Sequence, residues 1–380
     1  MLVSLFALAP FFSCLFWTIL LLNVPDDKRH SKNILVLFML CATVLYLTHA
    51  FYFSDNKLIY ENFDDIYIFV SLSIFPLYYL FMVSTTKESI HQPKYVWHVI
   101  PAFFFSFLYG AVSLTLTHKQ YDEFTLRFLH ATSLSPLSIS YRPDQLAIIF
   151  LISRAFYLSQ IILYVFLGLR LSKNWKRRLE ESVSETEGKE LRQIEILSGI
   201  CLFMAIIGFF VDSFGRFFIP NHPLILLLPA FLFTPLFFKA GLIGYKHNFS
   251  VLDLEEDEKY ILLEGVEYYE QPSKIRQRLE LLMVEKQIYL TPDLRISTLC
   301  EELHTNRTYL SQVLNEELKE NFNFFINKYR VNHAIELLKN SKWDNYSLDK
   351  FAELSGFGST ISMIRAFKLI TGKTPSEFRI

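Results

Sequence analysis

The chain has 380 residues, of which 52% are hydrophobic and 16% aromatic, and its mean hydropathy is +0.27. Such a composition excludes a disordered or fibrous chain, because it supplies ample apolar surface and contains only 12 glycines. The formal net charge of −1 indicates neither an acidic nor a basic partner. Four cysteines stand far apart, without metal-site or redox spacing, and we interpret them as small buried hydrophobes: Cys14, Cys41, Cys201 and Cys300.

Seven apolar runs occupy the first two thirds of the chain. A membrane-spanning helix needs roughly 20 mostly apolar residues, because the hydrocarbon core is about 30 Å thick. Polar gaps separate the runs, which argues against the core of a soluble helical protein. We therefore predict that residues 1–245 form a seven-helix transmembrane bundle that serves as a sensor domain. The runs are Leu2–Val24, Asn33–Phe53, Asp65–Ser84, Tyr95–Thr117, Gln145–Leu171, Ile194–Phe214 and Pro223–Tyr245.

The distribution of lysine and arginine predicts how this bundle is oriented, because positively charged loops resist translocation. Alternate gaps, beginning with the gap after the first run, contain 12 of these residues when Arg170 at the edge of the fifth run is included, whereas the other gaps contain 5. Six further runs follow the first and no basic residue precedes it, so a cleaved signal peptide is disfavoured. We predict a multi-pass protein of the cell inner membrane, with its N-terminus outside and its C-terminal part in the cytoplasm.

A few ionisable residues interrupt the apolar runs. His49, Arg154 and Asp212 lie inside predicted helices, with Arg216 close by. An unpaired charge in hydrocarbon is costly, so we expect Arg154 and Asp212 to pair inside the bundle, with His49 as a hydrogen-bond partner. Two interpretations remain open, a structural ion pair and a pocket that senses a signal.

The character of the sequence changes after residue 245. Eight acidic residues lie between Asp253 and Glu270, interrupted by apolar and aromatic residues. We interpret residues 246–273 as an acidic linker that stays away from DNA and from anionic lipid. A signal-transmitting linker and a merely solvated spacer both remain open.

Helical patterns fill residues 274–380. An amphipathic helix is predicted over Lys274–Gln287, and Ser297 can cap a short helix that ends at Leu303. After a turn, Asn306 can cap a second helix over Arg307–Leu318. Two short helices joined by a tight turn, with polar residues at the exposed N-terminal face of the second, are typical of major-groove recognition.

The same pattern occurs a second time after a spacer helix, predicted over Phe322–Asn340. Ser347 can cap a helix that ends at Gly356, a residue suited to a left-handed turn. Ser359 opens the last long helix. Its predicted core side includes Met363, Ala366 and Phe367, and its predicted exposed side includes Thr360, Ser362, Arg365 and Lys368. The fold class is therefore all-α throughout.

The second unit's residues resemble a known family. Gly356-Phe357, Phe367-Lys368 and the ending 371–379 resemble the signature of AraC/XylS-type transcription regulators, whose DNA-binding domain is two helix-turn-helix units on one spacer helix. The resemblance covers Lys274–Ile380 and includes earlier positions: Leu299, Leu303, Tyr309, Leu310, Ser311, Phe322, Phe325, Ile326, Asn327, Arg330, Ala334 and Ala352. The joining of this domain to a multi-spanning half resembles membrane-anchored AraC-type regulators of Bacteroidetes-like bacteria.

The resemblance implies that the second helix of each unit reads bases. The first unit's candidates are Arg307, Thr308, Ser311 and Gln312, and the second unit's are Thr360, Ile361, Ser362 and Arg365. Arginine can bind guanine at two atoms and glutamine can bind adenine likewise, whereas isoleucine could contact only a thymine methyl group. Three residues depart from the family pattern: Ile361 where a polar residue is common, Met363 where phenylalanine is usual, and Lys319 where glycine is frequent.

Charge and partners complete the prediction. Residues 274–380 contain 16 Lys and Arg against 13 Asp and Glu, a modest excess for a DNA binder. One copy should bind weakly, so we expect a homodimer. The other predicted partners are double-stranded DNA, the lipid bilayer, RNA polymerase and an unknown small or lipid-like signal. We expect no cofactor, no metal site and no catalytic residue.

These patterns predict a membrane-bound one-component transcription regulator, controlled by a signal that the transmembrane half senses. The alternative is a transporter or membrane enzyme with an appended regulatory DNA-binding module. No HExxH motif, phosphate-binding glycine loop or nucleophile motif favours that alternative.

Overall fold

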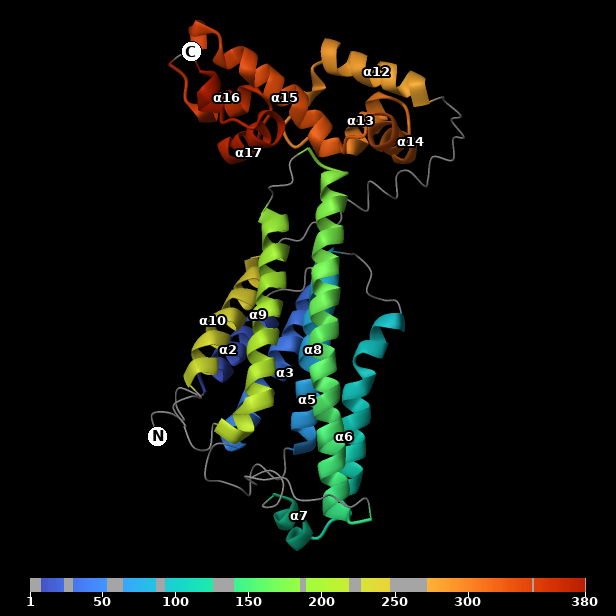
Figure 1. The fold of residues 1–380 in the computed structure, drawn as a ribbon, viewed down its shortest axis with the longest axis vertical. Coiled ribbons are helices and arrows are strands. Elements are labelled where there is room, and N and C mark those ends of the chain that lie inside the picture. The colour runs from blue at the N-terminus through green and yellow to red at the C-terminus, as the bar shows by residue number, and fades with distance from the viewer. Residues whose placement is uncertain are drawn as a thin grey trace. The chain divides into compact units, whose positions relative to one another are not determined.

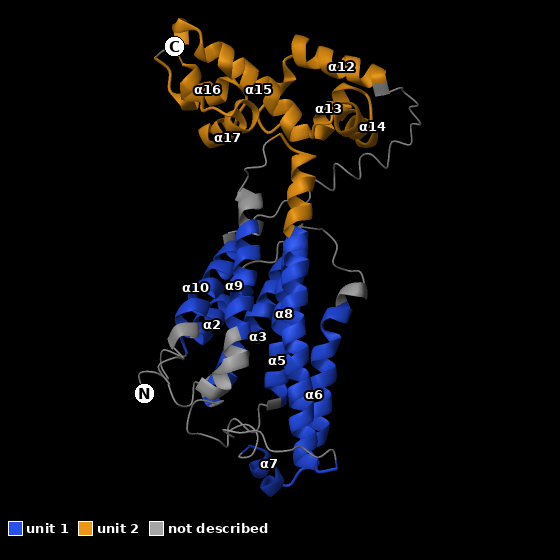
Figure 2. Cartoon of the chain, viewed as in Figure 1, with its two compact units in different colours: residues 1–171, 194–249 blue, residues 172–193, 250–380 orange. Residues whose placement is uncertain are grey.

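The computed structural model describes residues 8–23, 30–52, 64–86, 93–125, 140–184, 189–218, 227–246, 272–343 and 345–379. Within these ranges the chain is helical and contains no strand (Figure 1). One isolated antiparallel bridge joins Val183 to Arg295. The predicted all-α class is thus confirmed for the described residues. The chain divides into two compact units, 1–171 with 194–249 and 172–193 with 250–380 (Figure 2).

The first unit is built from apolar helices. Their bounds are α2 Ala9–Asn23, α3 His30–Tyr52, α5 Asp64–Thr86, the 3₁₀ helix η1 Pro93–His98, α6 Ile100–Ser113, α7 His118–Phe124, the first part of α8 Arg142–Glu180, α9 Lys189–Phe218 and α10 Leu227–Lys246. Helix α3 packs on both α2 and α5, and α10 packs on α2. A Cβ atom at Gly244 would lie 2.0 Å from Leu35 Cδ2, so glycine lets α10 approach α3 closely.

Each predicted apolar run overlaps a helix of this unit, and residues 2–7 and 223–226 of the first and last runs lie outside the described residues. Three helical stretches among the described residues are long and apolar enough to cross a membrane: Ser31–His49, Asp65–Thr85 and Arg142–Glu180. Four others are apolar but shorter: Ala9–Asn23, Ile100–Ser113, Glu195–Phe209 and Ala230–Tyr245. Seven crossings therefore stay a prediction.

The second unit contains the C-terminal helices. They are α12 Pro272–Glu285, η4 Ile288–Leu290, α13 Ile296–Glu302, α14 Arg307–Gln312, the π-helix η5 Val313–Glu317, α15 Phe322–Leu338, η6 Ser341–Trp343, α16 Leu348–Leu354, α17 Thr360–Thr371 and η7 Pro375–Phe378. Residues 172–193, predicted as an inner loop of the bundle, cluster with this unit. Residues 247–271, nearly all of the predicted acidic linker, lie outside the described residues.

Helix α15 organises two small cores. Its N-terminal half contributes Phe322, Phe325 and Ile326 to one core, which also contains buried residues of α12, α13 and α14. Its C-terminal half contributes Val331, Ala334 and Leu338 to a second core, shared with α16 and α17. One helix thus serves both units of the repeat, as the spacer prediction requires.

Two local predictions were wrong. Ser297 does not cap α13, because Arg295 is the N-cap, in an extended conformation and without a side-chain cap bond. That backbone is extended where it pairs with Val183, so the helix begins earlier than its sequence suggests. The α-helix from Arg307 ends at Gln312 rather than Leu318, and a π-helical turn follows it.

Candidate functional site

The first helix-turn-helix unit consists of α13, a turn and α14. Asn306 caps α14 by accepting a hydrogen bond from the Tyr309 backbone N–H at 3.0 Å, as predicted. His304 in the turn has φ 48°, a left-handed conformation. Leu310, Val313 and Leu314 are buried, which fixes one face of the second helix against the core and leaves the opposite face outward.

All four base-contact candidates of this unit lie on α14. Thr308 and Gln312 are exposed, and Ser311 and Arg307 are half-buried. The Gln312 amide donates to Glu316 Oε2 at 3.1 Å. Arg307 Nη2 donates to the Ser182 hydroxyl at 2.7 Å, a contact that the sequence did not predict.

The second unit repeats this layout with α16 and α17. Ser347 accepts a bond from Lys350 N at 3.3 Å and Ser359 accepts one from Ser362 N at 3.1 Å, so both predicted caps are present. Between the helices, Gly356 adopts φ +77°. A Cβ atom there would lie 2.7 Å from Leu290 Cα and from the Tyr289 carbonyl oxygen, so glycine is required both for the turn and for the close contact with η4.

Three of the four candidates on α17 face outward. Ile361 is 61% exposed, Arg365 is exposed and Thr360 is half-buried, with its hydroxyl donating to Asp349. The prediction that Ser362 is exposed was wrong, since only 7% of it is accessible. Its hydroxyl donates to the Ser359 carbonyl oxygen at 2.8 Å, which turns it inward at the helix start. Ser362 therefore has the geometry of a positioning residue.

Arg330 on α15 is the buried residue whose role sequence reasoning missed. It is fully buried, donates from Nε to the Tyr289 carbonyl oxygen at 2.7 Å and from Nη2 to that of Thr291 at 2.8 Å, and lies over the Phe357 ring. One side chain thus connects the turn after α12, the spacer and the second unit. Arg330 is one of the positions that resemble the family, but the sequence pattern does not predict which groups its guanidinium binds.

Surface electrostatics of the domain are locally balanced. Lys286 contacts Glu302, Lys328 contacts Glu320, and Lys350 contacts Glu353, each at 2.6–2.8 Å. The hydrogen bond and charge of Lys286 lower the pKa of Glu302. Each pair contributes little stability because its side chains are partly exposed to solvent. A lysine that pairs with a glutamate is less available to bind a DNA phosphate.

A polar cluster lies inside the apolar compact unit, residues 1–171 with 194–249. Arg154 Nη1 donates to the Tyr67 hydroxyl at 2.9 Å, and its guanidinium lies 5.0 Å from the Tyr157 ring centroid. The His49 ring lies 5.5 Å from that of Tyr67. Tyr67 thus contacts both His49 and Arg154, whereas the predicted role of His49 as a hydrogen-bond partner of an ion pair stays a prediction. Asp212 and Arg216 are on α9, but their side chains lie outside the described residues, so the predicted ion pair stays a prediction.

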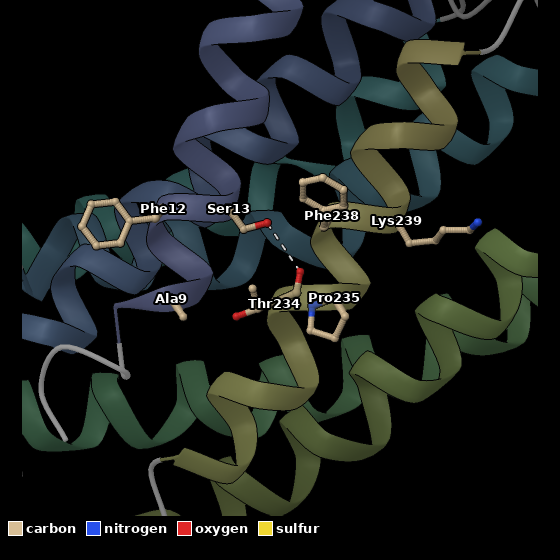
Figure 3. Close-up of a pocket in the computed structure, with 7 residues that line it drawn as sticks. All are labelled: Ala9, Phe12, Ser13, Thr234, Pro235, Phe238 and Lys239. Carbon is tan, nitrogen blue, oxygen red and sulfur yellow. Dashed lines mark hydrogen bonds between the residues drawn. The ribbon is translucent and has the colours of Figure 1, made fainter. Parts of the chain in front are cut away.

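An apolar pocket of about 580 Å³ lies between α2 and α10, lined by Ala9, Phe12, Ser13, Thr234, Pro235, Phe238 and Lys239 (Figure 3). The Ser13 hydroxyl donates to the Thr234 carbonyl oxygen at 3.4 Å across the pocket, whereas Lys239 extends away from it. The sequence did not indicate this pocket, because its lining comes from the first and last helices of the unit. No group of three or more potential metal ligands occurs within the described ranges.

Comparison with known proteins places the repeat in a recognised class. Residues 299–380 match a family model described as a helix-turn-helix domain. The chain is 30% identical over 94 residues to an uncharacterized HTH-type transcriptional regulator of Staphylococcus aureus (strain COL). It is 35% identical over 78 residues to the uncharacterized transcriptional regulatory protein YesN of Bacillus subtilis (strain 168). No solved structure matches the chain significantly.

These similarities are confined to the C-terminal part. They cover 24% and 20% of this chain, and only 12% and 21% of the two relatives. The C-terminal part is an AraC-type helix-turn-helix domain, and its relatives support a DNA-binding transcription regulator. The apolar unit lies outside the matched region.

Proposed function

We propose that this chain is a membrane-bound one-component transcription regulator that reads DNA sequence with α14 and α17 and responds to a signal received by its apolar unit. The observation that carries the proposal is the repeated, capped helix-turn-helix geometry on a chain that also contains apolar helices of membrane-spanning length. Arg307, Thr308, Ser311 and Gln312 read bases in the first unit, and Thr360, Ile361 and Arg365 do so in the second. Ser362 positions α17.

The decisive experiment is selection of duplexes from a random-sequence pool by the full-length protein in lipid nanodiscs. Arg307→Ala and Gln312→Ala should each weaken binding by about 1–3 kcal/mol at particular base positions, because bidentate base contacts contribute that much discrimination. Lys274→Ala, on α12 and outside the reading helices, is the matched control and should leave the base preference unchanged. Uniform weakening on every duplex would contradict base reading by Arg307 and Gln312.

The proposed topology puts this domain in the cytoplasm. Residues 172–193 are rich in lysine and arginine and belong to the same compact unit as the DNA-binding helices. Segments that fold together lie on one side of a membrane, which supports the orientation inferred from loop charge. A reporter fused to the C-terminus should report the cytoplasm. An external reading would contradict the topology and the access to DNA.

The proposed signal is small or lipid-like. The pocket between α2 and α10 is mostly apolar, and the Arg154 cluster supplies one cation inside the same unit. Both a sensing role and a structural role for the cluster remain compatible with its geometry. Normal reporter output and normal folding in Arg154→Gln, compared with Arg142→Gln at the start of the same helix, would exclude both roles.

A further inference from the structure

A short extended segment of the chain lies on the first helix-turn-helix unit. We define residues 182–184, which follow the end of α8, as the docking segment. The Ser184 N–H donates to the Leu294 carbonyl oxygen at 2.9 Å, and the Ile296 N–H donates to the Ser182 carbonyl oxygen at 2.9 Å. These two bonds flank the antiparallel bridge between Val183 and Arg295. The segment thus binds by backbone pairing, in the manner of strand addition.

Side chains of the spacer helix complete this binding site. Asn323 Nδ2 and Asn327 Nδ2 donate to the Ser184 carbonyl oxygen at 2.7 and 3.2 Å. Ser182 and Ser184 are only 2% and 0% exposed, so the segment is covered rather than resting on the surface. Both backbone polar groups of Ser184 are satisfied by the DNA-binding domain, which makes this a specific contact.

The docking segment also holds a residue proposed to read bases. Arg307, the first residue of α14, donates to the Ser182 hydroxyl at 2.7 Å, and that hydroxyl donates to the Arg178 carbonyl oxygen at 2.6 Å. Helix-turn-helix proteins contact base edges with the N-terminal residues of the recognition helix. A guanidinium that binds guanine at two atoms must point into the groove, so it cannot keep this geometry with Ser182.

The end of α8 lies next to this contact along the chain. Trp175 and Leu179 on its last turns are buried, each 6% exposed, and residues 172–193 belong to the DNA-binding unit. Helix α8 begins in the apolar unit and continues without a break to Glu180 (Figure 2). The chain therefore connects the docking segment covalently to the part proposed to receive the signal.

We propose that the docking segment is an intramolecular inhibitor of the first helix-turn-helix unit. When it is bound, it holds Arg307 at the N-terminus of α14, and DNA binds only after the segment is released. A signal then acts by changing the balance between docked and released states. This inference rests on the proposed DNA-binding function and adds a regulatory site to it.

A reversible cross-link provides the first test. Val183 and Arg295 form a non-hydrogen-bonded antiparallel pair, whose Cα atoms are about 4.5 Å apart, a separation that a disulfide can bridge. The Val183→Cys, Arg295→Cys double variant of the full-length protein should cross-link on oxidation, lose at least tenfold in affinity for a duplex enriched by the wild type, and regain it with reductant. The four native cysteines are buried, and the two single variants control for them. Failure to cross-link, or unchanged affinity after cross-linking, would overturn the proposal.

Release of the segment provides the second test. Ser184→Pro removes the N–H that bonds to Leu294 and should raise affinity for the same duplex about tenfold, with base preference kept. Ser182→Ala removes only the hydroxyl that Arg307 binds and should raise this affinity about threefold. Ser172→Ala, on α8 within the same unit, is the matched control and should have no effect.

The outcomes separate the two proposals. Equal affinity of the wild type and Ser184→Pro for an enriched duplex would overturn inhibition and leave DNA reading intact. No base preference in either protein, from any random pool, would overturn the proposed function and the inhibition with it.

Discussion

The two helix-turn-helix units share one layout but reach it with different residues. Both recognition helices begin at a side-chain cap, Asn306 in the first unit and Ser359 in the second. The first unit has left-handed residues at His304, in its turn, and at Lys319, after its recognition helix, whereas the second has glycines at the matching places, Gly356 and Gly372. The recognition helix of the first unit, α14, is also shorter than α17, and a π-helical turn follows it. The second unit therefore has the less strained backbone, and the first carries the intramolecular contact at Arg307.

The comparison depends on a common support, and Arg330 provides it. Removal of a buried, hydrogen-bonded guanidinium leaves two carbonyl oxygens without their donor, so Arg330→Ala should destabilise the domain by about 3–5 kcal/mol. Hydrogen exchange in the full-length protein should show faster exchange in both α13 and α16. The exposed pair of Arg276 with Glu280 is the control, and Arg276→Ala should cost about 0.5 kcal/mol or less. Faster exchange in only one unit would contradict the shared support.

Gly356 separates the effect of backbone conformation from that of close packing. Gly356→Ala combines a left-handed φ with a Cβ 2.7 Å from the backbone of residues 289 and 290, and should cost about 3 kcal/mol. Gly372 has nearly the same φ, +74°, but nothing lies within 4 Å of its Cβ position. Gly372→Ala should therefore cost only about 1 kcal/mol. Equal losses of stability in thermal unfolding would show that the left-handed conformation, and not the close approach to residues 289 and 290, determines the cost of both substitutions.

At Lys319 the reverse substitution, to glycine, is expected to increase stability. Lys319 adopts φ 56°, a left-handed conformation that glycine tolerates better than lysine. Lys319→Gly should stabilise the first unit by up to about 1 kcal/mol, because it relieves a left-handed conformation. Lys339 follows α15 with φ −83°, so Lys339→Gly should give no gain. A loss of stability in Lys319→Gly would mean that its side chain contributes more than its backbone costs.

The smallest expected effect is a dependence on pH. Burial lowers the pKa of His333 below 6.5, and its ring lies 6.1 Å from that of Tyr289. The folded state therefore binds fewer protons than the unfolded state. The contribution of His333 to stability should be constant above about pH 6.5 and should decrease as pH falls through that value. The slope of melting temperature against pH should flatten in His333→Gln, and an unchanged slope would assign the effect to another group.

Sequence reasoning was most successful where local signals decide. Caps at Asn306, Ser347 and Ser359, and the turn at Gly356, followed from side chains that bond to their own backbone or tolerate a positive φ. Ser297 failed as a cap because pairing with a distant segment extended the backbone at Arg295. Ser362 failed as an exposed residue because its hydroxyl turned back to Ser359.

The amino-acid sequence alone determined the helical class, the apolar and polar halves, and the repeated helix-turn-helix pattern, since each depends on periodicity and on residues near each other in the chain. Only the tertiary structure decided that Arg330 joins the turn after α12 to the second unit and that residues 182–184 bind beside Arg307. Those contacts connect positions separated by 41 and 125 residues, and no local propensity encodes such distances. They arise only when folding brings residues 182–184 beside α14 and residues 289–291 beside α15, so that distant groups come within hydrogen-bonding range.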